Sequence, residues 1–202
     1  MSSQPETPEG FSEAWLTLRE PADHAARAQS ITQQLSVWAR QKKTLTCMEL
    51  GAGTGSNLRF LCPLLGHDQR WLLVDNDPIL LNHLPVSISA WAARNNISCQ
   101  NTSHELVLKA DNFSARISWV QRDLAQNLPE LPFRDHDLVC ASALLDLTSA
   151  TWLEQLASQC INHQCGALFV LNYNGQIDWQ RPIKEDKLMN ELLNAHQLGD
   201  KG

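Results

Sequence analysis

Apolar residues follow two different spacings along the chain, and the two spacings alternate. Short, nearly continuous apolar runs predict buried strands at 45–50, 70–75, 115–121, 135–145 and 166–173. Apolar residues at steps of three and four predict helices at 55–65, 77–84, 86–95, 149–160 and 183–198. A turn at 111–112 separates the strand at 115–121 from a further strand that begins near 105. Strands that alternate with helices indicate a mostly parallel sheet with helices on both faces, so we expect a doubly wound, Rossmann-like α/β fold.

The part of the chain before the first strand predicts a helical cap. Apolar residues recur at Ala28, Ile31, Leu35 and Trp38, which predicts an amphipathic helix over 23–40. The preceding segment "FSEAWLTLREPAD" predicts a shorter helix that ends at Pro21. Residues 1–10 are polar and acidic and have little to bury, so we expect a disordered tail there. The expected organisation is this tail and a single domain at 11–202, formed by a helical cap at 11–44 and a sheet core at 45–202.

Three glycines follow the first predicted strand, in "TCMELGAGTGSN". In a parallel sheet, ligands bind at the carboxyl ends of the strands, and this turn lies at that edge. Gly51 allows unusual backbone angles, Gly53 lets a ligand touch the backbone, and Gly55 lets the next helix approach the strand. A turn without a ligand is the alternative, which the cost of ordering so many glycines disfavours. A dinucleotide fingerprint reads G-x-G-x-x-G/A, and Ser56 at its sixth place disfavours a pyrophosphate without excluding it.

Acidic residues end the next two predicted strands of the sheet. Asp75 closes "RWLLVD", where a carboxylate can accept hydrogen bonds from both hydroxyls of a ribose. Its alternative role is to cap the next helix, which Asp77 before Pro78 can do instead. Asp123 in "WVQRDL" is expected near an adenine amino group, with Leu124 covering the ring. A solvated turn residue is the alternative for Asp123.

Net charge, the length of the apolar runs and the spacing of the cysteines limit the binding partners, the cellular location and the metal content that we expect. The formal net charge is −6, and the one short basic stretch, "RQKK" at 40–43, is interpreted as the solvated end of a helix, which argues against nucleic-acid binding. No apolar run is long enough to cross a bilayer and no secretory signal is visible, so we expect a cytoplasmic protein that does not bind membranes. "CINHQC", from Cys160 to Cys165, suggests a metal site, but no second ligand pair lies at the usual spacing, so we expect no metal.

The order of these motifs resembles a known family. "MELGAGTGSN", "LLVDNDP", "VQRDL" and "DLVCASALLDL" are similar, in order and spacing, to the motifs of class I S-adenosylmethionine-dependent methyltransferases, over about 45–173. The segment "WLTLREPADHAAR" also resembles the N-terminal segment of a bacterial group within that family. The resemblance implies methyltransferase activity with S-adenosylmethionine as cofactor.

The same resemblance implies a role for individual residues. The glycine turn, with Ala52, would pass under the methionine part of the cofactor. Asp75 would hold the ribose and Asn76 would lie beside the adenine, which Asp123 and Leu124 would also bind. The methyl-donor side would be lined by the end of the strand at 135–145. The complete set of expected cofactor-binding residues is Glu49, Gly51, Ala52, Gly53, Gly55, Asn57, Asp75, Asn76, Asp123, Leu124, Ala141 and Ser142.

The sequence is less specific about the acceptor of the methyl group. Candidate bases are Asp146, Glu20, Asp23 and His24, although Asp146 can cap a helix and the others can lie on a solvated face. "ALLDL" does not match the Asn/Asp-Pro-Pro-Tyr/Phe pattern of methylation on nucleic-acid bases. The acidic charge also disfavours such a substrate, which leaves a small molecule, the expected acceptor, or a protein. A cofactor-binding but catalytically inactive module is the first alternative, and a nicotinamide-dependent oxidoreductase the second.

The end of the sequence departs from the family pattern. A class I sheet normally ends with an antiparallel hairpin beside its fifth strand, and 174–202 has room for little more than one helix. We therefore expect the hairpin to be missing, because the chain is truncated, the gene product is shortened, or the sheet is a variant. The strand "ALFVLNY" would then have an open edge, through which we expect a homodimer to form.

Overall fold

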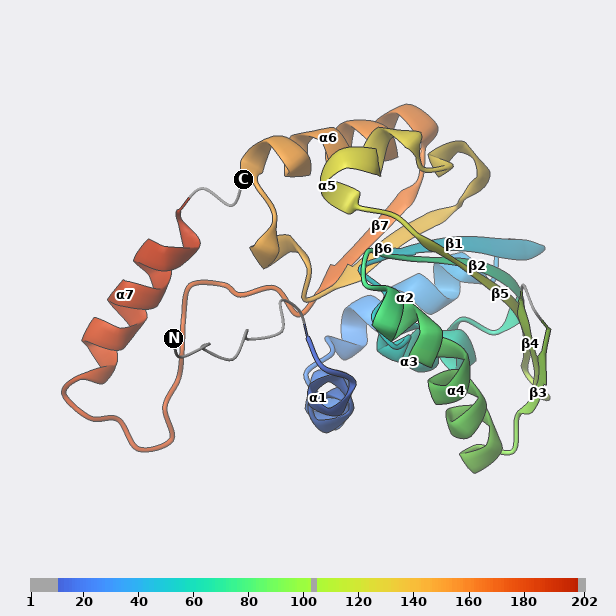
Figure 1. Cartoon of the computed structure of the whole chain (residues 1–202), viewed down its shortest axis with the longest axis horizontal. Helices are drawn as coiled ribbons and strands as arrows, with labels where there is room; N and C mark the ends of the chain where they lie inside the picture. The colour runs from blue at the N-terminus through green and yellow to red at the C-terminus, as the bar shows by residue number, and fades with distance from the viewer. Residues whose placement is uncertain (1–10, 103–104, 200–202) are drawn as a thin grey trace, which may run out of the picture.

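A seven-stranded sheet forms the centre of the protein (Figure 1). The computed structural model describes residues 11–102 and 105–199, so the tail expected at 1–10 lies outside the described residues. The strand order across the sheet is β3-β4-β5-β2-β1-β6-β7. The strands are β1 (Thr44–Leu50), β2 (His67–Asp75), β3 (Ser98–Asn101), β4 (Leu106–Lys109), β5 (Phe113–Gln121), β6 (Leu138–Ser142) and β7 (Gly166–Val170).

Five of these strands run in the same direction. β1 pairs in parallel with β2 and β6, β2 with β5, and β6 with β7. Two short strands extend one end of the sheet, with β4 antiparallel to β5 and β3 antiparallel to β4. Since β2 and β6 lie on opposite sides of β1, the chain switches direction across the sheet at the carboxyl end of β1. This arrangement confirms the mostly parallel, doubly wound fold.

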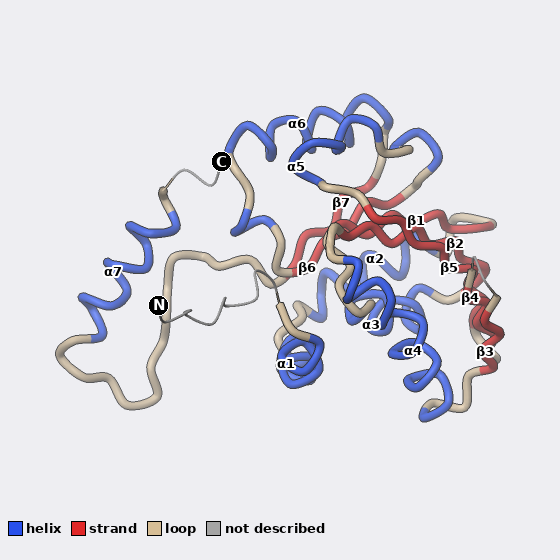
Figure 2. The backbone as a smooth tube through the Cα atoms, in the orientation of Figure 1, coloured by secondary structure: helices blue, strands red, loops and turns tan. Residues whose placement is uncertain are grey.

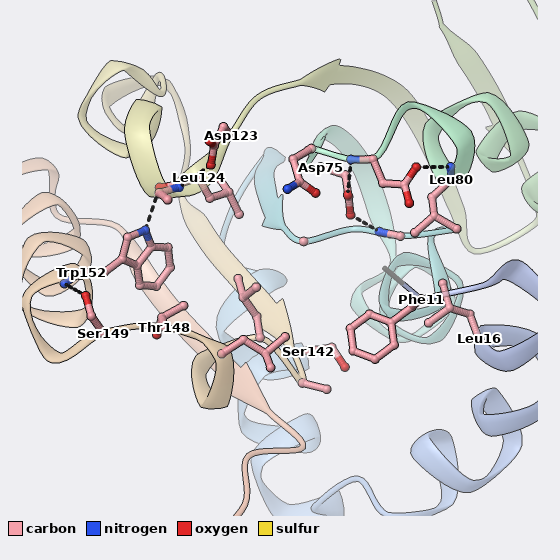
Figure 3. Close-up of a pocket in the computed structure, with 18 of the residues that line it drawn as sticks. Phe11, Leu16, Asp75, Leu80, Asp123, Leu124, Ser142, Thr148, Ser149 and Trp152 are labelled. Atoms are coloured by element: carbon pink, nitrogen blue, oxygen red, sulfur yellow. Dashed lines mark hydrogen bonds between the residues drawn. The ribbon is translucent and has the colours of Figure 1, made fainter. Parts of the chain in front are cut away.

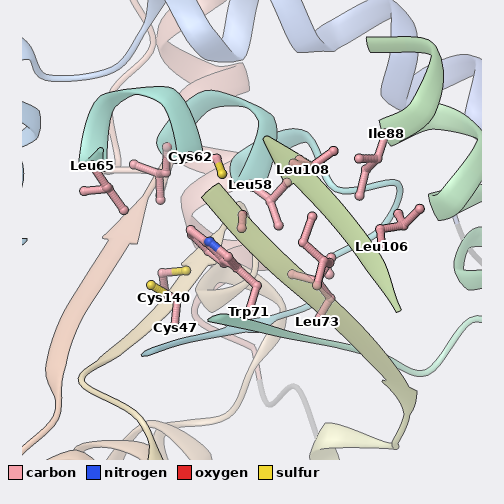
Figure 4. Packing of buried hydrophobic residues seen from close by; sticks show 14 of the residues in the cluster. Cys47, Leu58, Cys62, Leu65, Trp71, Leu73, Ile88, Leu106, Leu108 and Cys140 are labelled. Atoms are coloured by element: carbon pink, nitrogen blue, oxygen red, sulfur yellow. The ribbon is translucent and has the colours of Figure 1, made fainter. Parts of the chain in front are cut away.

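Helices cover both faces of the sheet (Figure 2). On one face lie α2 (Gln29–Ala39), α3 (Ser56–Leu65) and α4 (Pro78–Arg94); on the other lie α5 (Leu124–Asn127) and α6 (Ala150–His163). Leu58 of α3 and Trp71 of β2 are buried in the first of the two resulting cores (Figure 4). Met48 of β1 and Trp152 of α6 belong to the second. The side chains of β1 alternate between the two cores, so both cores hold the carboxyl end of this strand in place.

Prolines do not end the helices in the way that the sequence suggested. The helix α1 (Glu13–Ala25) continues through Pro21, whose side chain is on an exposed face where water can satisfy the freed carbonyl group. The predicted helices at 77–84 and 86–95 are one helix, α4, with Pro85 inside it. Buried residues on both sides of that proline pack into the same core, so tertiary packing keeps the helix continuous. β3 was not predicted.

The helix predicted over 23–40 is interrupted. α1 ends at Ala25, and α2 begins only at Gln29 after Ala28, which has an extended backbone. Residues 26–28 therefore form a junction between the two helices. This junction turns the side chain of Arg27 toward the interior, where it is buried.

The sheet has an open edge at β7. Its one neighbour among the described strands is β6, and residues 171–199 contain the helix α7 (Asp186–Gln197) and no strand. α7 stands away from the sheet in Figure 1 and has no buried residue. Pairing of this edge with a second copy stays a prediction. In the part of the chain that the structure describes, no helix has both the length and the apolar character that a membrane span requires.

Candidate functional site

The glycine turn after β1 is held in a shape that side chains rarely adopt. Gly51 and Gly53 have φ angles of 66° and 54°. A Cβ atom at Gly51 would lie 3.1 Å from Cδ1 of Leu144, and one at Gly53 would lie 3.2 Å from Cδ1 of Leu16. The turn therefore needs glycine both for its backbone angles and for the close approach of neighbouring side chains.

Asp75 ties this turn to the end of β2 (Figure 3). One of its carboxylate oxygens accepts a hydrogen bond from the backbone N–H of Gly53 at 2.7 Å, and the other accepts from the N–H of Asp77 at 3.0 Å. The alternative role considered for Asp75, capping the next helix, belongs to Asp77, whose Oδ1 accepts from the N–H groups of Ile79 and Leu80. A carboxylate oxygen has more than one acceptor position, so Asp75 retains acceptor capacity toward a ligand.

Asp123 lies at the end of β5 and caps a short helix. Its Oδ1 accepts from the N–H of Ala125 at 2.9 Å, and its Oδ2 accepts from the side-chain amide of Gln126 at 2.8 Å. It is therefore an N-cap rather than an unpaired turn residue. The next residue, Leu124, accepts a hydrogen bond through its backbone oxygen from the indole N–H of Trp152 at 2.7 Å. These contacts fix α5 against α6 at the same sheet edge as Asp75.

The ends of four strands meet in one cleft with a volume of about 780 Å³. This volume lies within the range of small-molecule sites, roughly 300–1,000 Å³. Seven of the expected cofactor-binding residues line it: Gly51, Gly53, Asp75, Asn76, Asp123, Leu124 and Ser142. The structure thus brings together residues as distant in the sequence as Gly51 and Ser142, because the carboxyl ends of parallel strands share one edge.

The other five expected residues lie behind the wall of the cleft. Ala52, Gly55 and Ala141 are buried, and a Cβ at Gly55 would lie 3.3 Å from Ile88 of α4. Glu49 and Asn57 are each only 1% exposed. Along β1 the side chains alternate between faces, so Glu49 points toward the side of α2 and α3. These residues can support the cleft, but they do not line it.

Part of the cleft lining comes from α1, from which the sequence predicted only candidate bases. Phe11, Leu16 and Arg19 line the cleft from this side. Three more lining residues follow β2 and β5: Asp77, Leu80 and Ala125. The rest of the new lining follows β6 and enters α6: Ala143, Leu144, Leu147, Thr148, Ser149, Thr151, Trp152 and Gln155. The resemblance of "WLTLREPADHAAR" to the family pointed to the importance of the N-terminal segment but not to its position over the glycine turn.

Polar contacts hold α1 over the turn. Glu20 forms an ion pair with Arg59 of α3, which is buried. Nε2 of His24 lies 3.2 Å from both the backbone oxygen and the hydroxyl of Ser56. Burial raises the pKa of Glu20, but the hydrogen bond and charge of Arg59, together with His24, outweigh burial and hold the pKa below its ordinary value.

None of the four candidate bases lines the cleft. Glu20 and His24 hold α1 in place, and Asp23 forms an ion pair with Arg19 at 2.7 Å. Oδ2 of Asp146 accepts a hydrogen bond from the backbone N–H of Tyr173 at 2.9 Å. Each side chain therefore has a structural role that does not depend on catalysis.

A buried polar cluster lies behind the glycine turn. Arg27 donates from Nη2 to the hydroxyl of Ser142 at 3.3 Å, and its guanidinium carbon lies 5.0 Å from the centre of the Phe60 ring. Burial raises the pKa of Glu49 to about 8; Arg27, Arg59 and Asn57 act to lower it, whereas Asp75 raises it further. The cluster brings a buried cation and a buried acid close to each other.

The suggested metal site at the end of α6 is not assembled. The thiol of Cys165 donates to the backbone oxygen of Phe133 at 3.1 Å, and the His163 ring stacks on the Phe133 ring. Among residues 11–102 and 105–199, no group of three or more His, Cys, Asp or Glu side chains is placed to hold a metal ion. The six cysteines are all free.

Comparison with known proteins identifies the fold. No protein-family model and no curated protein sequence matches the chain. A proposed S-adenosyl-L-methionine-dependent methyltransferase of Methanococcus maripaludis has a similar structure, with a TM-score of 0.50 and 13% identity over 83% of this chain and 67% of that one. An O-methyltransferase family protein of Burkholderia thailandensis has a TM-score of 0.52 and 15% identity over 94% of this chain and 47% of that one. The chain therefore spans about two thirds of the first protein and about half of the second, and it has the fold of the class I S-adenosylmethionine-dependent methyltransferases.

Proposed function

We propose that the protein binds S-adenosylmethionine in the cleft at the carboxyl ends of the strands and transfers its methyl group to a small molecule. The observation that carries the proposal is that two carboxylates and two glycines of the turn after β1 share this cleft. Asp75 and Asp123 end neighbouring strands, and Gly53 lies within hydrogen-bond distance of Asp75. A ribose, a base and a flexible tail would each meet a matching group there.

The residues of the cleft suit this cofactor in their chemistry. The backbone at Gly51 and Gly53 has no Cβ, so a ligand can lie directly against it. Asp75 can accept hydrogen bonds from ribose hydroxyls, and Asp123 can accept one from the amino group of adenine. Leu124 adds an apolar surface for the base. When bound, S-adenosylmethionine supplies a methyl group that is already activated by the sulfonium.

The remaining lining of the cleft would position the acceptor. Phe11, which precedes α1, and Leu16 of α1 line the cleft together with Leu144 and Leu147, which follow β6, so the cleft has an apolar part. Such walls exclude water and can hold an acceptor in line with the transferred group. Positioning of this kind can contribute roughly 7–11 kcal/mol to lowering a reaction barrier.

A second candidate function is cofactor binding without catalysis. One observation favours it: Glu20, Asp23 and Asp146 are each held by a protein partner and none of them lines the cleft. An acceptor that must lose a proton before attack would then find no base among these three. An acceptor that is already a nucleophile, such as a thiolate, would need none.

Calorimetry with S-adenosylhomocysteine and with NAD tests the proposal. We expect S-adenosylhomocysteine to bind and NAD not to bind. Asp75→Asn should weaken this binding by about tenfold or more, since it removes a charged acceptor. Asp68→Asn is the matched control, because Asp68 is exposed at the opposite end of β2. Binding of NAD alone would point to an oxidoreductase and refute the proposal.

A further inference from the structure

The cleft has one side that the expected cofactor-binding carboxylates do not occupy. In Figure 3, Asp75 and Asp123 lie along one side of the cleft, whereas Phe11 and Thr148 lie along the opposite side. We call this opposite side the acceptor end; it is lined by Phe11, Leu16 and the lining residues from Leu144 to Gln155. Its chemistry indicates the class of molecule that it can bind.

Apolar side chains at the acceptor end remain partly open to solvent. Phe11 is 47% exposed and Leu147 is 52% exposed, although both line the cleft. Leu16 and Leu144 add further apolar surface to the same lining. Because covering apolar surface is favourable roughly in proportion to its area, a ligand with an apolar body would gain affinity here.

Two polar side chains of α6 line the acceptor end without taking part in the fold. Thr151 and Gln155 lie four positions apart, so they share one face of α6. Both are exposed, and neither side chain has a hydrogen-bond partner among the described residues. The hydroxyl of Ser149, by contrast, caps α6 by accepting from the N–H of Trp152. The Thr151 hydroxyl and the Gln155 amide can therefore donate to, or accept from, a polar group of a ligand.

The charged side chains of the cleft already have partners. Among the described residues, the lining contains one cation, Arg19, whose Nε and Nη2 contact the carboxylate of Asp23 at 2.7 and 3.2 Å. The carboxylates in the lining each accept a hydrogen bond from a backbone N–H: Asp75, Asp77 and Asp123. An anionic ligand would meet a cation that is already paired, and a cationic ligand would meet carboxylates that are already hydrogen-bonded. Since burying a charge without its own partner is costly, the acceptor end favours an uncharged ligand.

These features define the class of the methyl acceptor. Resting on the proposed function, we propose that the acceptor is an uncharged molecule with an apolar body and a hydrogen-bonding group such as a carbonyl, a hydroxyl or an amide. Phe11 and Leu147 cover the apolar body, and Thr151 and Gln155 bind the polar group. The acceptor end thereby selects against carboxylates, phosphates and ammonium compounds.

Naphthalene compounds that differ in one group test this class. N-phenyl-1-naphthylamine, an uncharged dye that fluoresces in apolar surroundings, would report binding to the protein saturated with S-adenosylhomocysteine. Four competitors would displace it: 2-acetylnaphthalene with a ketone, 2-ethylnaphthalene without a polar group, 2-naphthoate with a carboxylate, and 2-naphthylmethylamine with an ammonium group. The ketone should bind best, about threefold or more tighter than the ethyl compound. Each charged compound should bind about tenfold or more weaker than the ketone.

Protein variants locate the bound compounds. Leu147→Ser should lower the affinity for the dye by about threefold or more, because it removes apolar surface from the lining. Leu188→Ser is the matched control, since Leu188 is 56% exposed on α7 and does not line the cleft, and it should leave the affinity unchanged. Gln155→Leu should weaken 2-acetylnaphthalene but not 2-ethylnaphthalene, so that the difference between the two compounds isolates the hydrogen bond.

Three results would overturn the assignment of an uncharged acceptor. Either charged compound could bind as tightly as the ketone. Leu188→Ser, and not Leu147→Ser, could weaken the dye, which would place the dye on α7. S-adenosylhomocysteine could bind while none of the naphthalene compounds does, in which case the proposed cofactor binding would still stand. If S-adenosylhomocysteine itself does not bind, the proposed function fails, and the assignment of the acceptor fails with it.

Discussion

Glu49 should make the stability of the folded protein depend on pH in a direction unusual for a carboxylic acid. Burial raises its pKa to about 8, compared with an ordinary value of 4.5. Between these two values the folded protein holds a proton that the unfolded chain has lost. The free energy of unfolding therefore falls as the pH rises from about 4.5 to about 8, and the loss levels off above that. At 1.36 kcal/mol per pH unit, the interval corresponds to about 5 kcal/mol.

Glu49→Gln tests this reasoning because glutamine resembles the protonated acid in shape and cannot titrate. Near pH 5 the variant and the wild-type protein should have similar unfolding free energies. Near pH 8.5 the variant should be more stable by several kcal/mol, up to about 5 kcal/mol. Urea unfolding followed by tryptophan fluorescence at several pH values gives both curves, and their difference isolates Glu49 from all other titrating groups.

The control is Glu154→Gln, on the exposed side of α6. Its curve should run parallel to that of the wild-type protein over the whole pH range. Parallel curves for Glu49→Gln as well would refute the reasoning, since they would mean that Glu49 is ionised in the folded protein near neutral pH.

Three further changes have expected outcomes. Gly53→Ala introduces a Cβ near Leu16 at a positive φ, so we expect a loss of about 1–2 kcal/mol in unfolding free energy and weaker S-adenosylhomocysteine binding by calorimetry. Glu20→Gln removes the partner of the buried Arg59, which should cost about 3 kcal/mol in urea unfolding and make α1 more sensitive to limited proteolysis; an unchanged cleavage rate would contradict this role. Asp123→Ala removes a helix N-cap and a proposed contact to the base, so unfolding free energy should fall by about 1 kcal/mol while affinity for adenosine falls too.

The sequence was sufficient to predict the strand-end half of the site. The glycine turn, Asp75 and Asp123 each follow a buried strand, and parallel strands bring such positions to one edge without further information. The alternation of side chains along β1 also implies that Glu49 and Leu50 point to opposite faces. These inferences need only local pattern and sheet geometry.

The α1 half of the site could not be predicted in the same way. Leu16 and Arg19 reach the cleft through tertiary contacts, and no local pattern specifies which loop a neighbouring helix will cover. Pro21 suggested a helix end, but an exposed proline inside a helix is tolerated when water can replace the lost hydrogen bond. Pro85 misled in the same way, and there the helix continues because core packing on both sides outweighs one missing backbone bond.

The bond between Asp75 and the N–H of Gly53 has a consequence for binding energetics. The carboxylate orders the glycine turn before any nucleoside arrives, so that the conformational entropy of the turn is lost during folding rather than during association. Because of this preorganisation, Asp75 contributes both to the stability of the fold and to the affinity for the nucleoside. Substitution at Asp75 should therefore slow ligand capture as well as weaken it, because a loosened turn must first return to its bound shape.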